Sequence, residues 1–196
     1  MNHNQFLQKL WSTVQDKKIV EPIASFKLRS LNINVYQNDV LRVPSESIIC
    51  GKLTPVNPLG VIFPEFCGVG LAWGYTPACP SEIQSSIDEE VVIPIGSSEV
   101  TLAKYIGVVN PLYRSMQNQL TRTIESLTGE LCCQSVSIIA PTRGEPNSLK
   151  CISANEVVDA VINTVNDKAL LVNLVDEWNP MPYVEQLRER GISQLF

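Results

Sequence analysis

The chain has 196 residues, of which 44% are hydrophobic and 18% charged, with 20 acidic side chains against 15 Lys and Arg. This composition excludes intrinsic disorder, which requires low hydrophobicity and a high charge fraction. No apolar run reaches the ~18 residues that cross a membrane, and the N-terminus shows no signal-peptide core. The net charge of −5 argues against nucleic acid as a partner. We therefore expect a soluble, cytoplasmic protein with one or two compact domains.

The first half of the chain predicts a helix followed by a meandering antiparallel sheet. Residues 4–17 carry apolar side chains at helical spacing. Residues 23–43 alternate with period two, which predicts a hairpin in which Val40, Leu41 and Val43 return as the second strand. The alternation changes parity between Leu28 and Leu31, so we expect a β-bulge near Ser30. Further short strands are predicted at Ser47–Leu53, Gly60–Phe63 and Cys67–Trp73.

Residues 99–127 carry the longest helical signal in the chain. Apolar side chains, among them Ile106 and Val109, recur at spacings of three or four. Asn110-Pro111 interrupts the pattern because proline lacks an amide donor and biases the preceding residue away from the helix. The pattern predicts two helices, with Gly129 as the C-cap of the second.

The last third of the chain alternates between strands and helices, which is typical of a parallel α/β unit. A capping box at Ser153–Glu156 predicts the start of the first helix, and Gly191 fits the C′ position of the second. The expected elements are a strand at Ser135–Ala140, a helix through Val165, a strand at Ala169–Val175, a helix at Pro180–Arg190 and a strand at Ile192–Phe196.

These patterns predict a mixed α/β fold in two parts. Residues 1–130 form an α+β part with antiparallel strands and a long helical region. Residues 131–196 form a small parallel, Rossmann-like βαβαβ unit. Because 66 residues make a marginal independent domain, we expect this unit to pack with the first part as one body.

A single histidine, His3, limits the chemistry that the chain can perform. A Ser-His-Asp or Cys-His arrangement needs an ordered imidazole, and residues at a chain end are usually mobile. Zinc sites of the Cys₂His₂ or HExxH kind are excluded by count. Carboxylates, thiols and cationic side chains remain, so the sequence leaves open whether the protein is an enzyme and specifies no cofactor.

The six cysteines fit no zinc-ribbon or iron–sulfur spacing, and without a secretory signal we expect reduced, buried thiols. Cys67 differs because it precedes Gly68-Val69-Gly70. The two glycines could expose its sulfur, and the backbone amides there could form an anion-binding nest. The alternative is a strand in which the glycines permit close packing.

Two predicted loops follow parallel strands, where ligands bind in open α/β sheets. The loop at 141–148 contains Glu145 and Arg143, whose guanidinium can grip a carboxylate or phosphate bidentately. The loop at 176–179 contains Asp176, Glu177 and Trp178. An acid at the end of a buried strand can bind a ribose hydroxyl or a metal, and Trp178 can stack on a flat ligand. In the structural alternative, Asp176 and Asn179 cap the following helix and Trp178 covers the edge of the core.

Three further segments resemble the heavy-metal-chelation proteins in their order along the chain. These are Cys67–Leu71, Asn110–Leu112, and Asn179–Pro182 before a helix that ends at Gly191. The resemblance implies a small sheet-and-helix domain followed by a Rossmann-like domain.

We predict that the protein binds a small anionic ligand or a metal ion at the loops that follow the C-terminal parallel strands. The alternatives are an interaction or assembly protein without a small-molecule site, including a homo-oligomer, and a protein of the heavy-metal-chelation kind. No membrane or nucleic-acid partner is expected. The predicted ligand-binding residues are Arg143, Glu145, Asp176, Glu177, Trp178 and Cys67.

Overall fold

A computed structural model describes residues 20–38, 40, 43–51, 91–94, 104–109, 115–139, 147–164, 169–176 and 179–196. The predicted helix at 4–17 and the predicted strands at 60–63 and 67–73 lie outside these residues. Among the described helices, none is long and apolar enough to cross a membrane.

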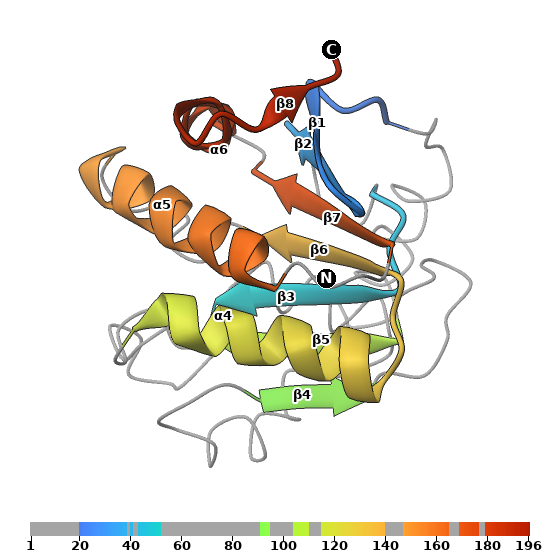
Figure 1. Cartoon of the computed structure of the whole chain (residues 1–196). Coiled ribbons are helices and arrows are strands. Elements are labelled where there is room, and N and C mark those ends of the chain that lie inside the picture. The colour runs from blue at the N-terminus through green and yellow to red at the C-terminus, as the bar shows by residue number, and fades with distance from the viewer. Residues whose placement is uncertain are drawn as a thin grey trace, which may run out of the picture.

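The described strands form one eight-stranded mixed sheet in the order β4-β5-β3-β6-β7-β2-β1-β8 (Figure 1). Its five central strands, from β5 to β2, run parallel to one another. The outer strands β4, β1 and β8 are antiparallel to their neighbours. The fold is therefore mixed α/β, as predicted. The strand bounds are β1 Ala24–Leu28, β2 Leu31–Tyr36, β3 Ser47–Gly51, β4 Val91–Pro94, β5 Tyr105–Val109, β6 Ser135–Ile139, β7 Leu170–Val175 and β8 Ser193–Gln194.

The first hairpin is formed by β1 and β2 alone. Leu28 pairs with Leu31 across a two-residue turn, in which Arg29 has a φ of 54°. The break in the alternation of apolar and polar residues between Leu28 and Leu31 marks this turn, because each of the two strands has its own alternation. The predicted bulge near Ser30 and the predicted return strand at 40–43 are therefore wrong. The second neighbour of β2 is β7, which runs parallel to it.

The helical signal between 99 and 127 contains a strand. β5 pairs in parallel with β3, so the prediction of a helix through Ile106 and Val109 is wrong. A run of five residues cannot distinguish a buried strand from a buried helix by periodicity. The described helix of this region is α4, Met116–Glu125, with Ser115 at its N-cap accepting from the amide of Asn118.

The α4 helix continues into a π-helical turn, η2, at Ser126–Glu130. Gly129 lies inside this turn and does not cap the helix, which corrects that prediction. The residue that takes up the left-handed conformation after the turn is Cys132, with a φ of 56°.

The C-terminal region contains the predicted parallel β6–α5–β7 unit. The α5 helix spans Asn147–Asn163, so it begins before the predicted capping box at Ser153. The α6 helix spans Met181–Glu189 and is followed by Gly191 with a φ of 65°, as the C′ prediction requires. The final strand β8 pairs antiparallel with β1 and therefore does not extend the parallel unit.

The helices α4, α5 and α6 lie on one face of the sheet (Figure 1). The main core forms between the sheet and these helices, where apolar residues at alternate positions of the strands contact the buried sides of the helices. Fully buried side chains at this interface include Ile33, Ile49, Val136, Ile138, Val172, Leu120, Ile124, Val157, Val161 and Leu187.

Candidate ligand-binding edge

The five parallel strands place their carboxyl ends along one edge of the sheet, which we call the carboxyl edge. The arrowheads of β3, β6 and β7 point to it in Figure 1. The strands end there at Val109, Gly51, Ile139, Val175 and Tyr36. Because side chains that follow parallel strands converge beyond such an edge, it is the place where an open α/β sheet forms a binding crevice.

Five of the six predicted ligand-binding residues lie outside the described part of the chain. In the sequence, Arg143 and Glu145 follow β6, Glu177 and Trp178 follow β7, and Cys67 lies between β3 and β4. The connections that contain Arg143, Glu145, Glu177 and Trp178 therefore leave the sheet at the carboxyl edge. The binding roles of these residues stay predictions.

Asp176 is described, and at the carboxyl edge it links the ends of β7 and β2 to the segment that leads into α6. It directly follows β7 and is 3% exposed. Its backbone amide donates to the carbonyl of Tyr36 at 3.1 Å, which ties the ends of β7 and β2 together. Its carboxylate Oδ1 accepts from the amide of Asn179 at 3.1 Å, and Asn179 Oδ1 accepts from the amide of Met181 at 3.3 Å. Of the two residues that the structural alternative assigned to capping, Asn179 binds the amide of the first α6 residue, Met181, whereas Asp176 binds the amide of Asn179, before the N-cap position at Pro180. The ligand-binding role of Asp176 stays a prediction.

Tyr183 brings a buried phenol into the same region. It lies in the first turn of α6 and is 3% exposed. Burial raises the pKa of the Tyr183 phenol, and the charge of Asp176 raises it further. The phenol therefore stays protonated at neutral pH and cannot serve as a general base there.

Tyr36, at the end of β2, is a carboxyl-edge residue that the sequence interpretation missed. It is buried, and Asn34 Nδ2 donates to its hydroxyl at 3.4 Å. Burial raises the pKa of the Tyr36 phenol. The sequence feature that indicates a strand end at Tyr36 is the polar stretch Gln37-Asn38-Asp39, which directly follows the strand. It was overlooked because the hairpin prediction assigned this stretch to an antiparallel turn; Asp39 itself lies outside the described residues.

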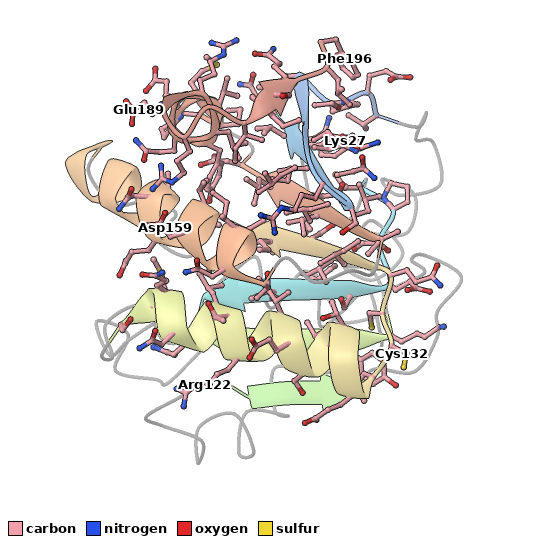
Figure 2. The ribbon with its side chains drawn as sticks, in the orientation of Figure 1. Lys27, Arg122, Cys132, Asp159, Glu189 and Phe196 are labelled. Atoms are coloured by element: carbon pink, nitrogen blue, oxygen red, sulfur yellow. The ribbon has the colours of Figure 1, made fainter. Side chains whose placement is uncertain are left out.

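Metal-ligating side chains do not gather in the part of the chain that the structure describes: no group of three or more His, Cys, Asp or Glu could hold an ion there. Two thiols in this part are free, the exposed Cys132 and the buried Cys133. Cys132 lies on the side of the molecule where β3 and β6 begin, away from the carboxyl edge (Figure 2).

Comparison with solved structures identifies the fold. A substituted form of the Oceanobacillus iheyensis macrodomain has a TM-score of 0.63 at 14% identity, covering 88% of this chain and 95% of its own. The same macrodomain with ADP has a TM-score of 0.54 at 13% identity, covering 88% and 98%. A Trypanosoma brucei macrodomain in complex with ADP-ribose has a TM-score of 0.50 at 10% identity, covering 81% and 69%.

The sequence by itself matches no protein-family model and no curated protein. At identities of 10–14%, the structural similarity shows that this chain has the macrodomain fold, and shows the fold alone.

Proposed function

We propose that this protein binds ADP-ribose, or another ligand with an ADP group, at the carboxyl edge. The observation that carries the proposal is the parallel arrangement of β5, β3, β6, β7 and β2, which directs the connections predicted to bind an anion to one edge. The macrodomain fold supports the choice of ligand, since structures with that fold hold ADP and ADP-ribose.

The chemistry of ADP-ribose suits the residue types that follow these strands in the sequence. The pyrophosphate needs a cation or a set of backbone amides, for which Arg143 and the glycines after Cys67 are the candidates. The adenine ring is flat and can stack on an indole such as that of Trp178. Asp176 supports the site by tying the ends of β2 and β7 to the segment that leads into α6.

Isothermal titration calorimetry tests the proposal directly. We expect saturable one-to-one binding of ADP-ribose and ADP, with much weaker binding of ribose 5-phosphate, which lacks the adenine and the pyrophosphate. If neither ADP-ribose nor ADP binds, the proposal is wrong.

A pair of variants tests where the ligand binds. Arg143→Ala is expected to weaken ADP-ribose binding by at least about tenfold, since a charged hydrogen bond is worth about 1.5–3 kcal/mol. Lys27→Ala is the matched control, because it removes an exposed cation from β1, opposite Asn32 near the start of β2 (Figure 2). Equal losses in the two variants would show that general electrostatic attraction, and not this edge, binds the anion.

Asp176→Asn separates ligand contact from the support of α6. The substitution removes the charge but keeps an oxygen that can accept from the amide of Asn179. Weaker binding at unchanged thermal stability would indicate direct contact between Asp176 and the ligand. Unchanged binding would restrict Asp176 to holding the start of α6.

A further inference from the structure

The centre of the sheet contains a row of polar side chains that are buried, except for the half-buried Asn34. Asn173 in β7 is in register with Asn34 in β2 on one side and with Ser137 in β6 on the other, and Asn34 is paired with Ser25 in β1. The strand neighbours of Asn173, Val172 and Leu174, belong to the core under the helices. Because successive side chains of a strand alternate between faces, the polar row lies on the face opposite α4, α5 and α6.

Asn173 is an unfavourable choice for stability at this position. It is 1% exposed, and its Oδ1 has no hydrogen-bond partner within the described residues. A buried acceptor without a partner destabilises the folded state, whereas a leucine or valine, the types that fill most of β7, would not introduce one. The asparagine at 173 therefore calls for a role other than packing.

The Asn173 amide holds a backbone group of the segment that joins β2 to β3. Asn173 Nδ2 donates to the carbonyl of Pro44 at 3.3 Å, and also to Ser137 Oγ at 3.3 Å. The segment leaves Tyr36 at the carboxyl edge and enters β3 at Ser47, at the opposite edge. Because β7 and β6 lie between β2 and β3, a residue in the middle of β7 is well placed to fix the segment along its path.

Other contacts secure the end of the same segment next to β3. The amide of Glu46 donates to Ser135 Oγ at 2.9 Å, and the Glu46 carboxylate accepts from the amide of Gln134 at 2.5 Å. Val43 is buried, and its amide donates to the carbonyl of Val40 at 3.0 Å. Asn173 differs from these partners because it belongs to the strand that continues directly into Asp176 at the carboxyl edge.

We propose that Asn173 is a positioning residue for the ligand site. By holding the Pro44 carbonyl, it fixes the β2–β3 segment on the face of β7 opposite the helices, and this segment begins at Tyr36, beside Asp176 at the carboxyl edge. The inference rests on the proposed function, since it assigns Asn173 an effect on the binding of ADP-ribose without contact with the ligand.

Asn173→Leu, with Ser137→Ala as the matched control, tests the inference. The leucine has a similar size and removes the donor to Pro44. The alanine removes the other partner of the same amide and leaves the Pro44 contact intact. We expect Asn173→Leu to weaken ADP-ribose binding about tenfold, the effect of one hydrogen bond, with no larger fall in melting temperature than in Ser137→Ala. Ser137→Ala is expected to bind within about twofold of wild type.

Hydrogen exchange supplies a readout that needs no ligand. The amides of Val43 and Glu46 are expected to exchange faster in Asn173→Leu than in wild type, while amides of α4 such as that of Leu120 do not. If the leucine variant folds poorly, Asn173→Ala removes the same donor without the branched side chain and is measured in its place.

The outcomes separate the inference from the proposed function. Wild-type affinity in the Asn173 variant, or unchanged exchange at Val43 and Glu46, overturns the role of Asn173 while leaving the proposed function standing. Failure of the wild-type protein to bind ADP-ribose and ADP overturns the proposed function, and with it the assignment of Asn173 to a ligand site.

Discussion

Gly107 in β5 lies against Thr123 of α4 with no room for a side chain, and Gly107→Ala should destabilise the fold. A Cβ added at Gly107 would lie 2.4 Å from Thr123 Cγ2 and 3.3 Å from Ile49 Cγ1. Carbon atoms prefer separations of about 3.5–4.0 Å, so the first contact requires a movement of about 1 Å. Thr123 cannot turn away easily, because it is 1% exposed, is branched at Cβ, and donates from Oγ1 to the carbonyl of Gln119 at 2.8 Å.

Two effects of the added methyl group oppose each other. Alanine is favoured over glycine in a strand by about 0.5–1 kcal/mol, because glycine loses more conformational freedom on folding. Overpacking of a tight core costs about 1–3 kcal/mol, and the 2.4 Å contact of Gly107 places it in the upper part of that range. We expect a net loss of about 1–2 kcal/mol in the free energy of unfolding, or about 2–4 °C of melting temperature for each kcal/mol.

Chemical denaturation of a double-mutant cycle checks the assigned clash. Thr123→Ser deletes the methyl group that the new Cβ at position 107 would meet and keeps the hydroxyl that bonds to Gln119, so it should restore much of the stability that Gly107→Ala removes. Gly129→Ala is the control, because nothing lies within 4 Å of its added Cβ. Wild-type stability in Gly107→Ala, or strict additivity of the two substitutions at 107 and 123, would refute the reasoning.

Three further predictions concern ionisable and reactive groups. The pKa of Tyr183 is higher in the folded state than in the unfolded state, where it is about 10. The stability that the neutral phenol contributes is thus complete below pH ~10 and is lost as the pH rises above it. In urea titrations, the free energy of unfolding should fall less between neutral and alkaline pH in Tyr183→Phe than in wild type. An equal fall in both proteins would contradict the assignment to Tyr183. Thiol labelling of the native protein should modify the exposed Cys132 much faster than the buried Cys133, because burial raises the pKa of the Cys133 thiol. One fast-reacting thiol should therefore disappear in Cys132→Ser but not in Cys133→Ser. Arg190→Ala should lower the free energy of unfolding by about 1 kcal/mol or less, since its guanidinium pairs at 2.7 Å with a partly exposed Asp159 and joins α6 to α5; an effect that does not shrink in high salt would mean that packing, and not charge, is responsible.

Local patterns in the sequence predicted several elements that the structure contains. The nearly continuous apolar run Ala169–Val175 predicted a strand, and β7 is that strand, with all but one of its residues buried and with β6 and β2 as its neighbours. Gly191 predicted the end of α6, because a left-handed C′ residue favours glycine. Asn179, one of the two residues considered for the start of α6, accepts from the amide of Met181 there, since a short acceptor side chain before a helix commonly binds its free amides.

Other features depend on contacts between distant segments, which local patterns do not encode. Tyr105–Val109 has the same apolar content whether it is a turn and a half of helix or a strand, and only its pairing with β3 decides. The prediction of a return strand at 40–43 failed in a similar way, because the second partner of β2, besides β1, is β7, far along the chain. The close approach of Gly107 to Thr123 likewise exists only once β5 and α4 are packed together.

The sequence by itself determined the mixed α/β class and the types of most local elements, because hydrophobic periodicity and capping residues act over a few neighbouring positions. It also restricted the chemistry by its single histidine. The tertiary structure decided the strand order, the macrodomain fold and the position of Asn173 beside Ser137 and Pro44. Those features follow from the register and crossing of strands, which are selected by the burial of the whole sheet rather than by any one segment.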